Sequence, residues 1–245
     1  MIENYKCKFK FHGKFIFVPS LICDKKAKRL LAFGASIELP NYFFHYRPGG
    51  HVDALHRHLE SRHFFRIDLK NFFYSIGRNR ISRLLRQHHF PGNARTYAEW
   101  STVRNPYPDG PRYALPIGFR QSPLLASLVL YDSALASAIE DAYARGVFVS
   151  IYFDDLIGSS NEIKELQVTY DGILAACVQA NLIANPDKLV SPADAIVAFN
   201  CDLTHGRAQV TDARIQRFVD EHRGAQAEEA FLAYCERVER RNHPA

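Results

Sequence analysis

The beginning of the chain alternates lysine with aromatic or aliphatic side chains. In residues 5–18, YKCKFKFHGKFIFV, this period of two runs on both sides of His12-Gly13. Alternation is typical of strands with one buried face, and a His-Gly pair between two such runs favours a tight turn. The pattern therefore predicts a β-hairpin with one basic face.

Apolar residues at helical spacing predict most of the other elements. In SPLLASLVLYDSALASAIEDAYARG we expect one long helix, with Ser122 as its cap and Gly146 at its end. Residues 91–114 are rich in Pro, Gly and Asn and predict a loop. Further helices are predicted after Pro19, from about Val52 to Ser61, from Asn79 to about His89, from a Ser159–Glu162 capping box to about Asn181, from Thr211 to about Arg223, and over roughly 226–241.

Three segments predict strands. HFFRIDLK (63–70) alternates well enough for a strand, and GVFVSIYF followed by LIGSS predicts a hairpin with Asp154-Asp155 at its tip. DAIVAFNCDLTHGRAQV predicts a second hairpin, around His205-Gly206. Because strands and helices are mixed without regular β-α-β alternation, the predicted fold class is α+β.

Charge is unevenly distributed along the chain of 245 residues. The net charge is +5, but residues 1–120 hold 21 Lys/Arg and 8 Asp/Glu, a net of +13, whereas residues 121–245 hold 10 and 18, a net of −8. Such asymmetry suggests that the first half binds a polyanion, and a bipolar surface without a binding role is the alternative.

Several protein classes are disfavoured by what the sequence lacks. It shows no apolar leader, no run of about 18 apolar residues and no Walker A or G-x-G-x-x-G motif. The five cysteines form no CxxC pair and no zinc spacing. Their odd number and the missing leader predict reduced thiols in a cytoplasmic protein that binds no membrane.

Carboxylates mark two of the predicted strand ends. Asp68 comes late in an apolar strand, and Asp154-Asp155 lies at a hairpin tip. Aspartate favours turns, so each position alone has a simple structural explanation. Together, two hairpin carboxylates beside a third on a neighbouring strand would form a hard-oxygen site for two Mg²⁺ ions. Two such ions can activate a 3′-hydroxyl and stabilise leaving pyrophosphate in an in-line displacement.

Four motifs follow one another in the order RIDLKNFFYSI, LPIGFRQSPLLASLVL, IYFDDLIGSS and NPDK. In this order and at these separations they resemble the consecutive motifs of reverse transcriptases, and the hairpin is similar to their Tyr-x-Asp-Asp box. YRPGGHVDAL (46–55) resembles the segment before the first catalytic motif in bacterial and group II intron enzymes. The resemblance covers roughly residues 10–215. It implies a right-hand polymerase fold with fingers, a palm and a short helical thumb.

On this resemblance the chain divides into three parts. Residues 1–62 would form the N-terminal part of the fingers, residues 63–210 the palm with an inserted fingers segment at about 78–114, and residues 211–245 a reduced helical thumb. A thumb of two short helices would grip a duplex weakly. We therefore expect RNA, a companion protein or self-association to supply the missing grip.

The resemblance also assigns catalytic roles. Asp68 and Asp154 would bind both metal ions, Mg²⁺ or alternatively Mn²⁺, and Asp155 would help hold the second. Lys188 matches the lysine that meets the triphosphate and protonates pyrophosphate, with a solvated turn lysine as the alternative.

The nucleotide pocket is implied in the same way. Phe73 matches the aromatic gate that clashes with a ribose 2′-hydroxyl, which implies dNTP substrates, and a plain core aromatic is the alternative. Gly118 and Gln121 lie in the segment that would shape the pocket. Two positions depart from the family pattern, since Ile117 replaces the usual glutamine and Phe153 is bulkier than the usual residue in the Asp-Asp box.

Nucleic-acid contacts would come from the basic half. Arg80, Arg83 and Arg86 on one predicted helix form the best cluster for template phosphates, with a solvated helix face as the alternative. Lys14 and Arg47 are further candidate phosphate contacts.

These inferences favour an RNA-directed DNA polymerase of bacterial type, which would use dNTPs and an RNA template to make a DNA product. Similarity to stand-alone bacterial enzymes implies a dedicated noncoding RNA as template and a role in anti-phage defence. Two alternatives stay open. One is a template-independent or protein-primed polymerase on the same fold, for which Ile117 and Phe153 leave room. The other is a catalytically idle RNA-binding subunit, against which the intact carboxylates argue.

Overall fold

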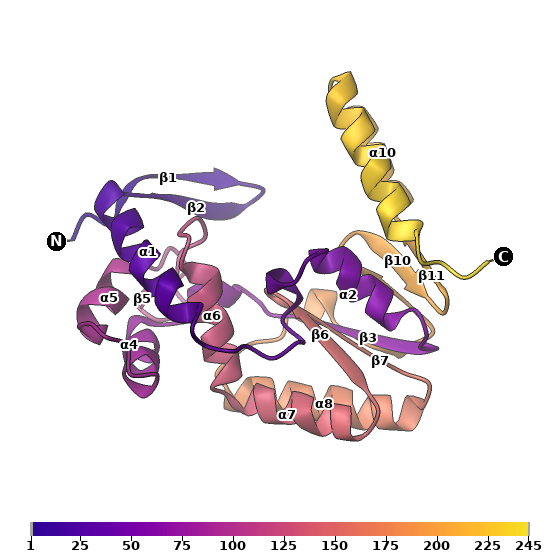
Figure 1. The fold of residues 1–245 in the computed structure, drawn as a ribbon, viewed down its shortest axis with the longest axis horizontal. Coiled ribbons are helices and arrows are strands. Elements are labelled where there is room, and N and C mark those ends of the chain that lie inside the picture. Colours follow the sequence, from indigo (N-terminus) through magenta and orange to yellow (C-terminus); the bar gives the residue numbers. More distant parts are fainter. Residues whose placement is uncertain (1, 245) are drawn as a thin grey trace. The chain divides into compact units, whose positions relative to one another are not determined.

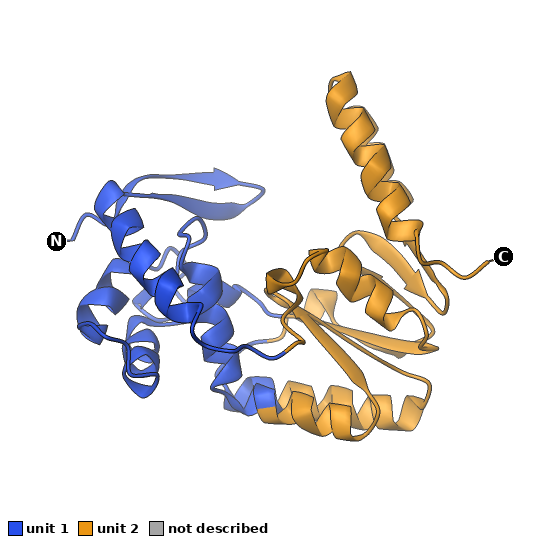
Figure 2. Ribbon diagram, in the orientation of Figure 1, with its two compact units in different colours: residues 1–40, 69–136, 176–183 blue, residues 41–68, 137–175, 184–245 orange. Residues whose placement is uncertain are grey.

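The computed structural model describes residues 2–244 and shows two compact units (Figure 1 and Figure 2). Unit 1 consists of the segments 1–40, 69–136 and 176–183, and unit 2 of the segments 41–68, 137–175 and 184–245. Because each unit is assembled from three segments, each depends on contacts between residues far apart in the sequence.

Unit 1 begins with the predicted basic hairpin, which is confirmed. Strands β1 (Tyr5–Phe11) and β2 (Lys14–Pro19) are antiparallel, with Lys10 opposite Phe15. His12 and Gly13 close the turn at φ values of 46° and 75°. Left-handed residues at both central positions give a two-residue turn the twist that paired strands need.

A small apolar core holds the rest of unit 1 together. Its buried residues come from β2, α1, α3, β4, β5 and the segment before α6, and they are Phe17, Cys23, Tyr74, Val103, Ala114 and Phe119. Trp100 packs against this core. The elements that follow the hairpin are α1 (Leu21–Gly34), α3 (Phe72–Ser75), α4 (Arg78–Gln87), α5 (Ala94–Trp100), β4 (Val103–Arg104), β5 (Tyr113–Ala114) and α6 (Ser122–Tyr131).

Residues 91–114 do not form one loop, so that prediction is wrong. Asn93 caps α5 by accepting a hydrogen bond from the backbone N–H of Thr96 at 2.9 Å. Ala94, Tyr97 and Ala98, spaced as on one face of a helix, are buried. The helix was not predicted because its buried face has only three residues and its flanking segments are rich in Pro and Gly.

The segment 122–146 forms two helices where one was predicted. α6 and α7 (Ala134–Ala144) are bent by 65° at the break between them. There the Ser133 hydroxyl donates to the carbonyl of Leu130 at 2.6 Å, in competition with helical backbone bonding. The predicted cap is also wrong, because Gln121 holds the cap position and Ser122 lies inside α6. Within residues 2–244 no single helix is long and apolar enough to cross a membrane, and this bent pair meets both criteria only when its halves are combined.

The centre of unit 2 is a four-stranded antiparallel sheet of order β6-β7-β3-β8. β3 and β7 pair along their whole length, from His63 opposite Ser160 to Asp68 opposite Asp155. The sheet thus places two predicted site residues side by side at one end. Its strands are β3 (His63–Asp68), β6 (Phe148–Tyr152), β7 (Asp155–Ser160) and β8 (Val190–Ala193).

Side chains of β3 alternate between the two faces of this sheet. Phe65 contacts Tyr170 of α8 (Ile163–Gln179), with ring centroids 5.4 Å apart. Phe64 joins a core with Leu55 of α2 (Gly50–His58). α2 therefore covers the face that carries Asp68, and α7 and α8 run along the other (Figure 1).

A second sheet of three strands follows, where a two-stranded hairpin was predicted. β9 (Ala195–Ala198), β10 (Cys201–Thr204) and β11 (Arg207–Val210) are antiparallel. Phe199 and Asn200, both left-handed at φ 54° and 60°, make the unexpected first turn. The predicted turn at His205-Gly206 is confirmed. The two last helices are also confirmed, as α9 (Asp212–Asp220) with Thr211 as its cap and α10 (Ala225–Glu239).

A buried polar network ties α2 to the four-stranded sheet. His58 is 0% exposed, and its ring nitrogens lie 2.7 Å from Ser159 Oγ and 2.8 Å from Ser150 Oγ. Ser159 is therefore a strand residue inside this network, and its predicted role as a helix cap is wrong. Ser159 also donates a hydrogen bond to Ser61 at 2.9 Å, so the ring and the three hydroxyls form one connected group.

The protein is expected to lose stability as the pH falls below about 6.5 because of His58. Burial, followed by the charge of Arg57, lowers the pKa of His58 from 6.5 to about 3. Between these values the unfolded chain binds a proton that the folded protein excludes. The folded state should lose up to about 1.4 kcal/mol per pH unit over this window.

Urea unfolding followed by circular dichroism at about pH 7.5, 6 and 5 measures this dependence. The His58→Gln variant is the control, because it removes the titrating group and should give a flatter profile. Equal slopes for the two proteins would show that His58 is not responsible.

Candidate active site

Two carboxylates lie next to each other because of strand register. Asp68 is the last residue of β3 and Asp155 the first of β7, and they are direct partners in the antiparallel pair. Cross-strand partners project from the same face, with Cβ atoms about 5 Å apart. Asp68 is 3% exposed, so its charge lies at the buried edge of the site.

Asp68 is held by two side chains from the segment before β8. Lys188 Nζ lies 2.9 Å from Asp68 Oδ2, and Asn185 Nδ2 donates to Asp68 Oδ1 at 3.0 Å. The backbone N–H of Asn185 also donates to the Asp68 carbonyl at 2.7 Å. The lysine is half exposed, so its ammonium group neutralises Asp68 while still facing solvent.

Asp155 is held by Arg66 of β3. Both Nε and Nη2 of Arg66 donate to Asp155 Oδ1, at 2.9 and 2.6 Å. Burial raises the pKa of Asp155, and the guanidinium of Arg66 opposes that rise. Arg66 also donates to the Val197 carbonyl at 3.0 Å, which fixes the orientation of its guanidinium.

Asp154 occupies the turn between β6 and β7. The turn consists of Phe153 and Asp154, so the prediction that both aspartates form the tip is wrong. Phe153 is left-handed at φ 57°, and its ring stacks on His45 with centroids 4.5 Å apart. Burial lowers the pKa of His45 to about 4, so this ring is neutral at physiological pH. The position of Asp155 is thus set by the strand register, and that of Asp154 by the turn.

An open hollow of about 700 Å³ in unit 2 adjoins the two hairpin carboxylates. Its walls are largely aromatic and include two arginines from the C-terminal helical region. The aromatic and arginine side chains among them are His51, Tyr152, Phe153, Phe199, Phe218, Phe231, Tyr234, Arg214 and Arg223. Aromatic rings and guanidinium groups can stack on nucleobases, so the surface beside the carboxylates suits a nucleic-acid end.

The three carboxylates suit a divalent cation by their chemistry. Carboxylate oxygens are hard donors of the kind that Mg²⁺ prefers. In the structure Lys188 and Arg66 neutralise two of these groups, and within residues 2–244 no three His, Cys, Asp or Glu side chains are gathered as a metal site. The donor set fits Mg²⁺, which would compete with both cationic side chains for the carboxylates.

The predicted nucleotide-pocket residues belong to unit 1. Phe73 is half-buried and its ring centroid lies 5.4 Å from that of the buried Phe72. Gly118 is left-handed at φ 106°, and a side chain there would overlap the backbone carbonyl of Phe17. Gln121 is 1% exposed and donates to Ser101 Oγ at 3.4 Å. Gln121 therefore packs in the interior of unit 1, and Gly118 has a structural reason to be glycine.

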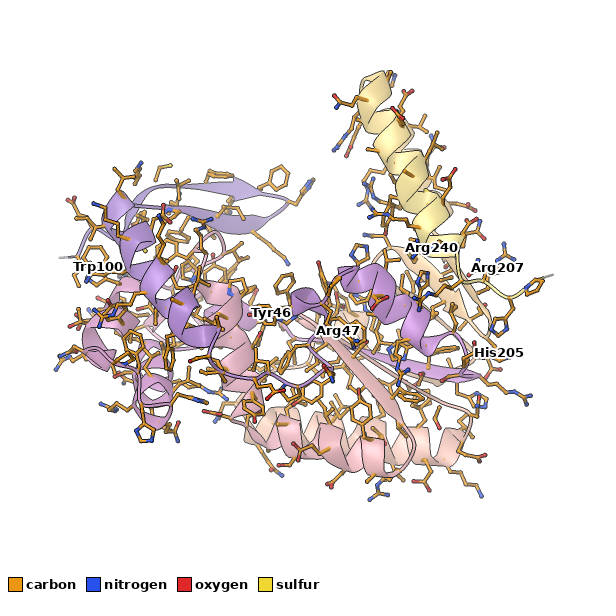
Figure 3. The ribbon with its side chains drawn as sticks, in the orientation of Figure 1. Tyr46, Arg47, Trp100, His205, Arg207 and Arg240 are labelled. Atoms are coloured by element: carbon orange, nitrogen blue, oxygen red, sulfur yellow. The ribbon has the colours of Figure 1, made fainter. Side chains whose placement is uncertain are left out.

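The predicted phosphate contacts differ in their surroundings. Arg80 is half-buried and donates to the Ala180 carbonyl at 2.7 Å, whereas Arg83 and Arg86 are exposed. Lys14 is exposed at the start of β2. Arg47 lies beside Tyr46, where the chain leaves the short 3-10 helix Phe44–Tyr46 (Figure 3). Arg80 therefore differs from Arg83 and Arg86 in its burial and its hydrogen bond, although all three lie on α4.

Two residues at the site were missed by the sequence reasoning. Arg66 stands two positions before Asp68 on the same strand, so the period of two already placed both side chains on one face. Asn185 begins the NPDK motif, and its amide reaches the same aspartate as Lys188. The sequence signal for the arginine is its spacing of two residues from Asp68.

One solved structure, a telomerase, supports the fold. A telomerase from Candida albicans in complex with telomeric RNA is similar with a TM-score of 0.50 and 9% identity, over 75% of this chain and 36% of that one. A foamy viral protease-reverse transcriptase in complex with double-stranded DNA has a TM-score of 0.49 and 15% identity, over 89% of this chain and 32% of that one. The chain therefore spans about a third of the length of each. No curated protein sequence matches it.

The α+β fold is that of the right-hand nucleic-acid polymerases. The model of one family, described as reverse transcriptase (RNA-dependent DNA polymerase), matches residues 23–195. This match covers most of the chain and includes all three carboxylates. The chain belongs to this reverse transcriptase family.

Proposed function

We propose that this chain is an RNA-directed DNA polymerase that joins dNTPs with the help of two Mg²⁺ ions. The observation that carries the proposal is the pairing of Asp68 with Asp155 at the sheet end where the turn presents Asp154. Membership of the reverse transcriptase family supports the same chemistry. Bound Mg²⁺ would supply the positive charge that phosphoryl transfer requires.

The chain's own residues would bind and orient the reactants. Asp68 and Asp154 would hold the metal ions, and Asp155 would stay oriented by Arg66. Lys188, half exposed on its 3-10 helix Pro186–Lys188, would neutralise phosphate charge and donate a proton to the leaving pyrophosphate.

The test is primer extension on a defined RNA template with dNTPs and Mg²⁺. The expected result is a DNA product whose sequence is complementary to the template. A product of unrelated sequence would indicate a template-independent polymerase. RNA binding without consumption of dNTPs would indicate an idle binding subunit.

Phe73 is expected to determine the sugar preference. Replacement by alanine removes a half-buried ring at the position that matches the family's aromatic gate, so incorporation of rNTPs relative to dNTPs should rise. An increase of about 100-fold corresponds to about 2.7 kcal/mol of lost discrimination. Steady-state kcat/KM for one dNTP and its rNTP measures the ratio.

The control for this variant is Phe72→Leu. Phe72 is 3% exposed and belongs to the core, so its replacement should lower stability without changing the sugar preference. If Phe73→Ala keeps the wild-type ratio, the ring is a core aromatic.

The biological setting is part of the proposal. We assign the template to a dedicated noncoding RNA and the role to anti-phage defence in the bacterial cytoplasm, a setting that rests on the motif resemblance to stand-alone bacterial enzymes. Sequencing the nucleic acid that copurifies with the protein from its host should give one discrete RNA with matching cDNA. A broad mixture of cellular RNAs would contradict a dedicated template.

A further inference from the structure

One hollow of unit 1 is surrounded by arginine side chains. It has a volume of about 610 Å³ and is lined by residues of α4, α5 and the segment that leads into β5. Its charged residues are Arg78, Arg83, Arg86, Arg95, Arg112 and Glu99. Five guanidinium groups against one carboxylate make it a strongly positive hollow, which we call the arginine hollow.

Its polypeptide scaffold is fixed by internal hydrogen bonds. Arg78 Nε donates to Thr102 Oγ1 at 2.9 Å, and its guanidinium lies 3.9 Å from the centre of the Tyr113 ring. Asn105 connects the two ends of the loop between β4 and β5. Its backbone N–H donates to Arg112 O at 3.0 Å, and its side-chain amide donates to Pro111 O at 3.0 Å. These contacts hold the walls of the hollow in place before any ligand binds.

Two of the five arginines are available to bind a ligand. Arg83 and Arg86 are exposed, and within residues 2–244 neither has a hydrogen-bond or ion-pair partner. Glu99 forms an ion pair with Arg95, with 3.5 Å between Arg95 Nε and Glu99 Oε1. The charges of the other four arginines are therefore not neutralised by a carboxylate of the hollow. Like charges gathered without counter-charges repel one another, so the cluster is stabilised when an anion binds.

We propose that the arginine hollow binds phosphate groups of RNA, and this rests on the proposed function for the identity of the polyanion. Guanidinium forks match phosphate oxygens bidentately, and several forks around one open hollow suit consecutive phosphates of one strand. An apolar small ligand is disfavoured, because most of the side chains that line the hollow are charged. The sequence predicted a phosphate-binding cluster of Arg80, Arg83 and Arg86. In the structure Arg83 and Arg86 line the arginine hollow together with Arg78, Arg95 and Arg112, and Arg80 does not line it.

The hollow is a separate surface from the basic hairpin. Within unit 1, α4 and the β1–β2 hairpin lie well apart (Figure 1). Lysines predominate on the hairpin, whereas the hollow is lined by arginines alone among basic residues. One RNA in contact with both surfaces would be held at two places on this unit.

The test is binding of a fluorescein-labelled RNA hairpin, measured by anisotropy over a range of NaCl concentrations. Arg83→Gln/Arg86→Gln should raise Kd about 10-fold or more near physiological salt. It should also reduce the slope of log Kd against log salt by about 1.4 to 1.8, as expected for two lost phosphate contacts. The matched control is Lys25→Gln/Lys28→Gln, which removes the same charge from exposed positions on α1 and should leave the slope unchanged.

Equal losses in both double variants, with far-UV circular dichroism unchanged, would overturn the site in favour of general charge attraction. Competition by polyglutamate as strong as that by unlabelled RNA would also overturn it, because an acidic protein segment would then be the ligand. Primer extension by the wild-type protein is scored separately. A protein that binds RNA through the hollow without incorporating dNTPs would refute the polymerase proposal and leave this site standing.

Discussion

Replacing Asp154 with asparagine is expected to reduce dNTP incorporation by about 1,000-fold or more, with little loss of stability. The substitution keeps the shape of a turn residue and removes one negative charge beside the paired Asp68 and Asp155. Removal of a single group that stabilises transition-state charge lowers kcat by about 100- to 1,000-fold, and a metal ligand contributes at least as much. Primer extension with Mg²⁺ measures the loss.

Asp154 is a cleaner position for this test than Asp155. The side chain of Asp155 neutralises Arg66, so Asp155→Asn would leave a largely buried guanidinium without its counter-charge. That variant would lose stability as well as activity. Asp141→Asn, at an exposed position of α7, is the control for the loss of one carboxylate. Wild-type rates in Asp154→Asn would remove the candidate site from the reaction.

Gly118→Ala is expected to destabilise unit 1 by about 2–6 kcal/mol. The backbone at Gly118 has φ 106°, which L side chains rarely adopt, and a Cβ there would overlap the carbonyl oxygen of Phe17. Strain of this kind costs about 1–3 kcal/mol, and the overlap adds a similar amount. Relief would require β2 to move, because the N–H of Phe17 donates to the carbonyl of Ile117 at 2.9 Å.

The single tryptophan provides the measurement. Trp100 packs against the core that contains Phe17, so its fluorescence during urea unfolding reports on the affected region. Gly172→Ala is the matched control, because Gly172 lies within α8 and a Cβ there would have no neighbour within 4 Å. By circular dichroism that variant should be about 0.5–1 kcal/mol more stable. An unchanged midpoint for Gly118→Ala would mean that Gly118 is retained for another reason.

Strong local patterns were sufficient to predict most elements. The lysine-aromatic alternation, the His12-Gly13 turn and the Thr211 cap each depend on neighbouring residues, and the structure confirms all three. The turn at Phe199-Asn200 was missed because neither residue is glycine, although asparagine tolerates the left-handed region. The break after α6 was missed because Ser133 interrupts a helix without proline or glycine.

The motif residues of the candidate site were predictable from the sequence, but their side-chain partners were not. The three aspartates and Lys188 were found by motif order, and the structure brings Asp68, Asp155 and Lys188 together. Their partners could not be read from motifs, since the pairing of Arg66 with Asp155 depends on a register between strands 89 residues apart. The burial of Gln121 also depends on tertiary packing, and its polar side chain gave no indication of it in the sequence.

The position of β3 between β7 and β8 has a consequence for synthesis of the chain. β3 is complete at residue 68, but its first partner strand begins at residue 155 and its second ends at residue 193. At about 5–20 residues per second, a ribosome needs roughly 4–18 s to make the residues between the first two strands. During that interval HFFRID is an apolar strand with both edges unpaired, the kind of segment on which chaperones act and at which nascent chains aggregate. Codon-dependent pauses between β3 and β7 would lengthen this exposure, whereas pauses after β8 would leave it unchanged.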